Sequence, residues 1–453
     1  MQKKNISEIE ILGTLFRDGM QGCNINISLN DALKIVKRKA ELGWHYAELG
    51  FAGANDFTRN LIRSALREDL GQMKVCAFGR TGGAREKVSE SADVRGILEL
   101  KVPVAVIVAK SRMHDVVNSL MIEPSQNLQM VTDTVGYLKG RGLEVILDLE
   151  HAVDAWFGRG NFGEYMAEGD AAANRLHFLE VVKAGISAGA DCLVVCDTNG
   201  GTCPEEIAEM FDELALKFPG VKFGIHCHND NDLAVANSRA AVLHGARHVQ
   251  GVSAGLGERC GNANLFSLIP RLQLKDGIRI VSDEALQEFS KFSRQIAFAF
   301  NRDPSERAPF VGSNAFGTFA GMHASSENKD AGAYLQCKPS LVGNAKHIGI
   351  NMQSGKSNVD YLARELGVGL NKEQLNKFMA LYKEEIECGA FEVSNTSFIL
   401  ACLRVRGELS DFFDISGIRA GYEKNGKAGH GCADIKINVS NRQEHTIAEG
   451  KDS

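Results

Sequence analysis

Eight short apolar runs, separated by stretches of helical character, constrain the fold of this chain most strongly. The runs are rich in Val, Ile and Leu, which is typical of strands buried on both faces of a parallel sheet. Amphipathic helices are expected between them, for example at 30–42, 174–189 and 204–218. The strands are predicted at 10–16, 46–50, 74–79, 103–110, 143–150, 191–198, 221–228 and 247–255.

Eight strand–helix units of this length match the size and repeat of a (β/α)8 TIM barrel, an α/β fold. We therefore expect a barrel over residues 1–275. The alternative is an open doubly wound sheet, which normally carries a GxGxxG motif after its first strand. Here the strand at 10–16 runs into FRDGMQG instead, which favours the barrel.

The repeat ends near residue 276, and the remaining chain has a different character. A helical stretch at 282–300 leads into a Gly/Ser/Pro-rich passage at 303–334, and further helical patterns follow. We expect residues 276–390 to form linker and helical subdomains. Residues 391–453 contain short strand patterns and polar turns, and we expect a small α/β domain there.

Composition restricts the class of protein. With 44% hydrophobic and 24% charged residues among 453, the chain can bury a large core. A net charge of −6 predicts no nucleic-acid or membrane surface, and no apolar run reaches the roughly 20 residues of a membrane span. The 11 cysteines form no CxxC pair and the N-terminus lacks a signal peptide, so we expect a cytoplasmic protein.

The predicted strand ends carry a pattern of metal ligands. In HCHND, His226 and His228 alternate along a strand and therefore point the same way. Asp18 follows the first strand, which closes the barrel near the last ones, and Asn262 lies in the loop after the eighth. Two imidazoles with carboxylate and amide oxygens suit a divalent ion such as Mg²⁺, Mn²⁺ or Zn²⁺.

Other polar residues are predicted at the same mouth. Arg17, beside Asp18, is placed to balance negative charge on an enolate or a substrate carboxylate. Glu150 ends an apolar strand, so it either pairs with Arg17 or belongs to the catalytic machinery. Thr198 is a candidate for binding a substrate carboxylate. The glycines of GLGERCGN (255–262) permit tight turning and close backbone approach, and this loop is not of the nucleotide-binding GxxxxGK[ST] kind.

Taken together, RDGMQ, HCHND and GLGERCGN resemble the DRE-TIM metallolyases, in the branch of 2-isopropylmalate, homocitrate and citramalate synthases. DLEHAVDAW (148–156) and DTNGGT (197–202) are most similar to the citramalate synthase subgroup. FAGMHASS (319–326), SLVGN (340–344) and QEHTIAEG extend the resemblance over almost the whole chain.

The resemblance implies condensation of acetyl-CoA with a 2-oxo acid, followed by thioester hydrolysis, with a divalent metal held by Asp18, His226, His228 and Asn262. It implies that pyruvate is the oxo acid and citramalate the product. It also implies a homodimer in which His323 reaches the active site of the partner chain, assisted by Glu150. The tail from 391 would be part of a regulatory dimerisation domain.

Three alternatives stay open at this point. The oxo acid could be 2-oxoisovalerate, 2-oxoglutarate or a substrate of specialised metabolism, since Gly13 and Leu15 replace usual polar residues of strand 1, and the arginine pair after the strand-3 threonine is missing. A lyase of the hydroxymethylglutaryl-CoA type is the second, and the segments after the barrel argue against it. The third is a catalytically inactive barrel with a binding role, against which the intact metal and arginine positions argue.

Overall fold

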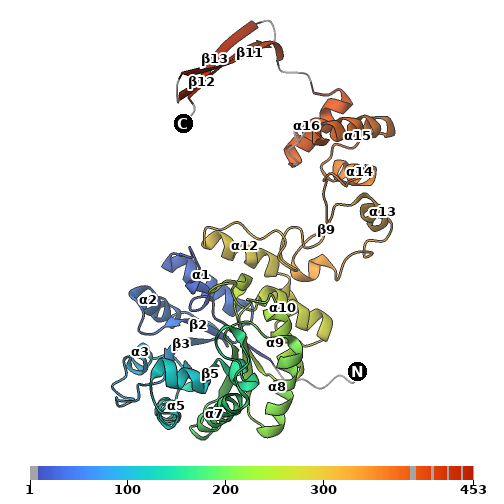
Figure 1. Ribbon diagram of the computed structural model, residues 1–453. Helices are drawn as coiled ribbons and strands as arrows, with labels where there is room; N and C mark the ends of the chain where they lie inside the picture. The colour runs from blue at the N-terminus through green and yellow to red at the C-terminus, as the bar shows by residue number, and fades with distance from the viewer. Residues whose placement is uncertain (1–8, 388–393, 410–412, 426–427, 440–441, 452–453) are drawn as a thin grey trace. The chain divides into compact units, whose positions relative to one another are not determined.

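The computed structural model describes residues 9–387, 394–409, 413–425, 428–439 and 442–451. Eight parallel strands close into a barrel in sequence order, with helices around them (Figure 1). The predicted TIM barrel is confirmed and the open doubly wound sheet is wrong. The strands are β1 (Glu10–Gly13), β2 (Tyr46–Phe51), β3 (Lys74–Arg80), β4 (Val104–Lys110), β5 (Glu144–Glu150), β6 (Cys192–Asp197), β7 (Phe223–Cys227) and β8 (His248–Gly251).

Helices connect successive strands, as the amphipathic patterns predicted. Their outer faces are polar and their inner faces pack on the barrel. The helix expected at 174–189 begins earlier, at Glu168. The barrel helices are α1 (Leu29–Glu41), α2 (Asp56–Ala65), α3 (Ala92–Leu100), α4 (Met113–Asp115), α5 (Pro124–Lys139), α6 (Ala152–Phe157), α7 (Glu168–Ser187), α8 (Pro204–Lys217), α9 (Ala234–Leu243) and α10 (Leu265–Arg271).

Residues alternate along each strand between two environments. On β6, Leu193 and Val195 point outward into the main core beneath the helices, whereas Cys192, Val194 and Cys196 belong to a smaller cluster inside the barrel. The interior is therefore packed rather than open, as in other barrels of this type. Polar side chains face inward nearer the carboxyl ends of the strands, and they form the site described below.

The chain divides into two compact units, each of which makes most of its contacts within itself. The first comprises 1–316 and 335–347, and it includes α11 (Asp283–Leu286) and α12 (Phe289–Ala299). Phe289 and Phe292 of α12 join the barrel core. The second comprises 317–334 and 348–453. Two short strands, β9 (Gly317–Thr318) and β10 (His347–Ile348), pair with each other.

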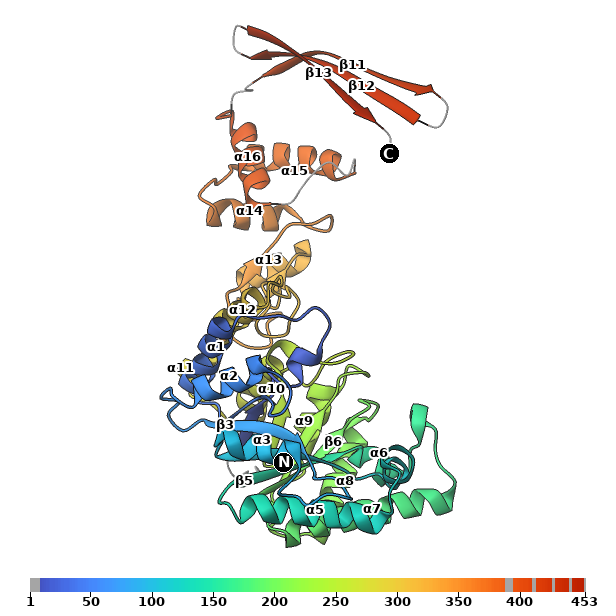
Figure 2. The same ribbon diagram turned by 90° about the vertical axis from the view of Figure 1, so that its left-hand side faces the viewer.

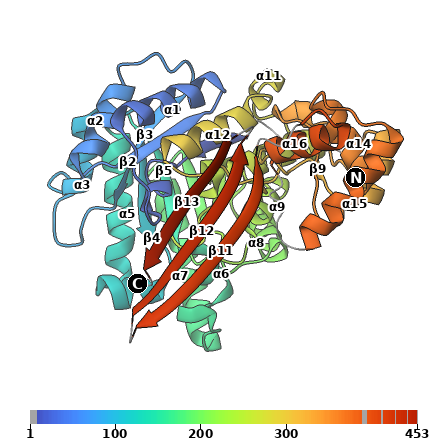
Figure 3. The same cartoon turned by 90° about the horizontal axis from the view of Figure 1, so that it is seen from above.

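The second unit contains helices and a small sheet. Helices α14 (Lys356–Glu365), α15 (Lys372–Glu387) and α16 (Asn395–Arg406) share a core and lie together in Figure 2, and α13 (Gly321–Lys329) precedes them. Strands β11 (Asp414–Asn425), β12 (Ala428–Val439) and β13 (Arg442–Lys451) form an antiparallel sheet, seen as three adjacent arrows in Figure 3. The helix and strands expected in a small C-terminal domain are thus present.

The boundary expected between 390 and 391 lies outside the described residues. In the part of the chain that the structure describes, no helix combines the length and the apolar character needed to cross a membrane.

Candidate active site and metal centre

Three predicted metal ligands meet at the carboxyl end of the barrel. The ligand atoms of Asp18, His226 and His228 all lie within 4.8 Å of one another, and all three residues are buried. The Asp18 Oδ2 atom is 3.3 Å from His226 Nε2 and 3.9 Å from His228 Nε2. A carboxylate and two imidazoles converging in this way can bind a divalent cation and leave positions for a substrate.

Local backbone structure explains how these side chains converge. His226 lies on β7, and His228 follows the strand end, on the same face two residues later. Asp18 belongs to a turn rather than to a strand, because β1 ends at Gly13 instead of reaching 16 as predicted. Thr14 holds this turn: its Oγ1 accepts the Asp18 N–H (3.3 Å) and its carbonyl accepts the N–H of Gly19 (3.1 Å).

Asn262 also reaches the cluster, through an isolated backbone bridge that places it opposite His228. Its Nδ2 group donates to Asp18 Oδ1 (3.0 Å), while its Oδ1 atom is buried and has no hydrogen-bond partner in the part of the chain that the structure describes. A free buried oxygen of this kind is expected where a ligand is to be bound. His228 Nδ1 is likewise buried and without a partner among the described residues. The donor set therefore fits a divalent cation.

The loop that delivers Asn262 requires two of its glycines. Gly257 and Gly261 have φ angles of +153° and +88°, in the region that favours glycine. A Cβ atom on Gly261 would lie 1.9 Å from the carbonyl oxygen of Gly255. Arg259 fastens the same loop by ion pairing with Asp230 (2.8 Å) and donating to the Thr198 carbonyl (2.8 Å). The predicted tight turning is confirmed.

Arg17 is held by two carboxylates at the edge of the cluster. Its Nε donates to Glu48 Oε2 and its NH1 to Asp18 Oδ2, both at 2.8 Å, and its guanidinium lies over the Phe78 ring. The proposed pairing of Arg17 with Glu150 is wrong, because Glu48 on β2 takes that position. The N–H groups not used in these bonds remain for a substrate, since a guanidinium has five.

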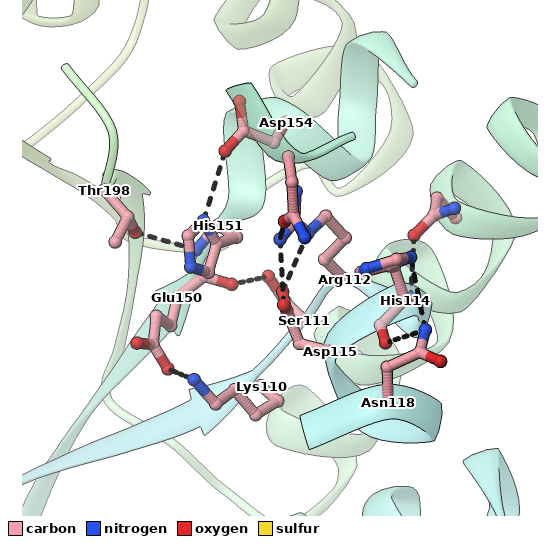
Figure 4. A network of polar contacts seen from close by, with 12 residues as sticks. Lys110, Ser111, Arg112, His114, Asp115, Asn118, Glu150, His151, Asp154 and Thr198 are labelled. Carbon is pink, nitrogen blue, oxygen red and sulfur yellow. Dashed lines mark hydrogen bonds and ion pairs between the residues drawn. The ribbon is translucent and has the colours of Figure 1, made fainter. Parts of the chain in front are cut away.

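Glu150 forms a different contact, shown in Figure 4. Its Oε2 atom is 2.6 Å from the ammonium nitrogen of Lys110, which ends β4 on the neighbouring strand. Thr198 accepts the backbone N–H of His151 at its Oγ1 (2.8 Å), so its hydroxyl proton can be donated elsewhere. Both predicted residues face the same cavity.

That cavity has a volume of about 850 Å³ and opens at the carboxyl ends of the strands. Apolar side chains such as Phe51, Phe78 and Val108 line one part of it. The polar lining includes every predicted site residue of the barrel except Asn262: Arg17, Asp18, Glu150, Thr198, His226 and His228.

Electrostatics in the cluster follow from burial and charge. Burial alone would raise the pKa of Asp18, but Arg17 and the two imidazoles outweigh it and hold that pKa far below its usual value. Burial lowers the pKa of His228 to about 4, helped by the charge of His226. For His226 the effect of burial is exceeded by the Asp18 carboxylate, and its pKa is raised. Asp18 therefore stays ionised, as a metal ligand must.

His323 lies in the second unit, on α13, where its ring stacks on Tyr334 with centroids 4.2 Å apart. The action of His323 at the active site of the partner chain stays a prediction.

The polar residues of the site that were not anticipated include Glu48, Asp148 and Gln250. They lie on β2, β5 and β8, respectively, and each is fully or almost fully buried. A signal for Asp148 was present, because it precedes Glu150 by two residues and so shares its face of the strand. Burial raises the pKa of Asp148 to about 7, with the nearby Glu48 adding to the effect.

The barrel and its cluster of ligands define a class of protein. Residues 8–296 match the HMGL-like family, and residues 310–388 match the family described as homocitrate synthase post-HMGL domain-like. The chain belongs to the HMGL-like family, and within it to the branch that contains the citramalate synthases. That placement rests on its curated relatives.

The relatives match nearly the whole chain. The (R)-citramalate synthase of Aquifex aeolicus is 35% identical over 98% of this chain and 82% of its own length. That of Geobacter sulfurreducens is 33% identical with the same coverage. The 2-isopropylmalate synthase of Sulfolobus acidocaldarius is 29% identical over 85% of this chain and 92% of its own length.

Among solved structures, the HMG-CoA lyase of Bacillus subtilis has a TM-score of 0.52 at 16% identity, covering 66% of this chain and 95% of its own. This likeness supports the barrel fold.

Proposed function

We propose that this protein condenses acetyl-CoA with pyruvate and hydrolyses the thioester, releasing citramalate and CoA. The observation that carries the proposal is the buried Asp18–His226–His228 cluster beside Arg17, at the mouth of a barrel whose full-length relatives include (R)-citramalate synthases. Pyruvate is favoured over 2-oxoisovalerate because identity is higher to the citramalate synthases than to the 2-isopropylmalate synthase.

Asp18, His226, His228 and the free Oδ1 of Asn262 are proposed to hold the cation. A divalent metal there, Mg²⁺, Mn²⁺ or Zn²⁺, would supply Lewis-acid polarisation of the keto group. The Thr198 hydroxyl is proposed to donate to the carboxylate of the oxo acid, since it only accepts in its bond with the His151 N–H and keeps its own proton for a donor role.

Carbon–carbon bond formation requires removal of a proton from the acetyl methyl group. We assign this step to His323 of the partner subunit with assistance from Glu150, whose carboxylate faces the cavity beside Lys110. Arg17, aligned by Glu48, would stabilise the negative charge that develops on the thioester oxygen as the enolate forms. The enolate carbon then attacks the keto carbon, and water cleaves the thioester. We also propose that the protein acts as a homodimer in the cytoplasm.

The test is a thiol-release assay of the purified protein with acetyl-CoA and each of pyruvate, 2-oxoisovalerate and 2-oxoglutarate. We expect the highest kcat/KM with pyruvate and citramalate as the product, identified by mass spectrometry. Asp18→Asn serves as the inactive control. A clear preference for 2-oxoisovalerate would reassign the protein to the 2-isopropylmalate synthases, and no turnover with any oxo acid would overturn the proposed reaction.

A further inference from the structure

A hydrogen-bonded chain of three buried side chains runs through the barrel interior behind the metal cluster. His226 Nδ1 lies 2.9 Å from Gln250 Oε1, and Gln250 Nε2 donates to Asp148 Oδ1 at 2.7 Å. Gln250 lies on β8 directly opposite His226 on β7, whereas Asp148 comes from β5. Gln250 is 0% exposed and Asp148 is 3% exposed, so water does not compete for these bonds.

The direction of each bond follows from the chemistry of the groups. In its ionised form the Asp148 carboxylate can only accept, and Gln250 Nε2 donates to it, so the amide presents its NH₂ group to Asp148. The amide oxygen of Gln250 then faces His226 Nδ1 and requires a proton on that nitrogen. In the neutral imidazole, the lone pair consequently lies on Nε2, which is the atom directed toward Asp18.

The reversed amide would have the opposite effect. With its NH₂ group toward His226, Gln250 would donate to Nδ1 and move the imidazole proton to Nε2, where it would block binding of a cation. Asp148 prevents this reversal because two facing carbonyl-type oxygens would repel each other. His228 has no such support, since its Nδ1 is buried without a partner in the described part of the chain.

We propose that Gln250 and Asp148 are positioning residues that lock His226 in the tautomer that presents Nε2 to a divalent cation. This inference rests on the proposed metal site. It adds that the affinity of the site depends on residues that do not touch the ion. Groups in the second layer around a metal commonly change its affinity by roughly 10–100-fold.

The primary experiment measures dissociation constants of Mn²⁺ and Zn²⁺ by competition with a chromogenic chelator, using the metal-stripped full chain. We expect Gln250→Leu and Asp148→Leu each to weaken binding by roughly 10-fold or more. Asp148→Asn keeps the size of the side chain but can present either its oxygen or its NH₂ group to Gln250, so it should lose the lock and weaken binding in the same direction as Asp148→Leu. Thr134→Val, which removes the hydroxyl that accepts the buried Gly82 N–H, controls for general destabilisation.

A second measurement reads the tautomer directly. Nitrogen-15 NMR of histidine-labelled, metal-free protein at pH 9 should show His226 protonated at Nδ1 in the parent, whereas Asp148→Asn should show both tautomers. In Asp148→Leu a mixture of the two tautomers is expected. Only a change in the proposed orientation moves this signal, because a purely structural loss would shift the thermal midpoint and leave the tautomer alone.

The outcomes separate the two proposals. If His226→Ala and Asp18→Asn bind metal as the parent does, the metal site itself is wrong. If those variants lose binding while folded Gln250→Leu and Asp148→Leu match the parent in affinity and tautomer, the metal site stands and the positioning role is refuted.

Discussion

Glu48 offers the most direct test of how the site is held together. Its carboxylate is 0% exposed and bonds the Arg17 guanidinium, whose side chain is 12% exposed. Glu48→Ala leaves Arg17 with Asp18 as its remaining carboxylate. Removing one partner of a buried ion pair costs about 3–5 kcal/mol, and we expect about 3 here because Asp18 compensates in part. At roughly 2–4 °C per kcal/mol, the thermal midpoint should fall by on the order of 6–12 °C.

Activity should respond more strongly than stability. Without Glu48, nothing fixes the Nε side of the Arg17 guanidinium, and a misplacement of about 1 Å can reduce turnover by roughly 10²-fold. Glu48→Gln keeps an oxygen that accepts from Arg17 Nε, so it should retain more activity than Glu48→Ala. The assays are thermal unfolding and thiol release with acetyl-CoA and pyruvate.

Glu213→Ala is the matched control, because it also removes a glutamate from an arginine pair. Glu213 contacts Arg175 at 2.8 Å, but both side chains are more than a third exposed. Such a pair contributes about 0–1 kcal/mol. If Glu48→Ala unfolds at the same temperature as Glu213→Ala and keeps full turnover, the role assigned to the Arg17–Glu48 pair is wrong.

Four further outcomes are expected. Chelator treatment or Asp18→Asn should abolish turnover while circular dichroism shows an intact barrel, and full-rate thiol release by metal-free protein would contradict the proposed chemistry. Lys39 is buried with no hydrogen-bond partner in the described residues, and burial lowers its pKa from 10.5 to about 7. Because the unfolded chain binds this proton more tightly, stability is lost as pH falls from 10.5 toward 7, so Lys39→Met should raise the thermal midpoint more at pH 6 than at pH 10; an equal gain at both would refute this. Gly261→Ala should destroy the loop that carries Asn262 and reduce activity and metal affinity together, whereas Gly142→Ala, which has a similar positive φ but open space, should lower only the midpoint. Finally, inactive His323→Ala and Asp18→Asn chains should recover part of the activity when subunits exchange, and no recovery after proven exchange would place His323 outside the partner's site.

Turns and strand ends show which structural features short sequence patterns can predict. The eight apolar runs predicted the strands well, since burial on both faces leaves a strong compositional signal. The first strand was predicted too long, because Thr14 draws the chain into a turn through hydrogen bonds that periodicity cannot detect. His226 and His228 were identified because a two-residue spacing on a strand fixes a common face.

The sequence by itself determined the barrel, the ligands at the strand ends and the glycines of the loop before Asn262, because each depends on short-range rules of periodicity and backbone conformation. Only the tertiary structure decided which of the buried polar side chains form hydrogen bonds with one another. Arg17 bonds Glu48 rather than Glu150, and Gln250 joins His226 to Asp148. These partners lie 24 to 102 residues apart along the chain. Closure of the barrel brings them into contact, and the low dielectric of its interior then favours the arrangement in which these buried polar groups are paired.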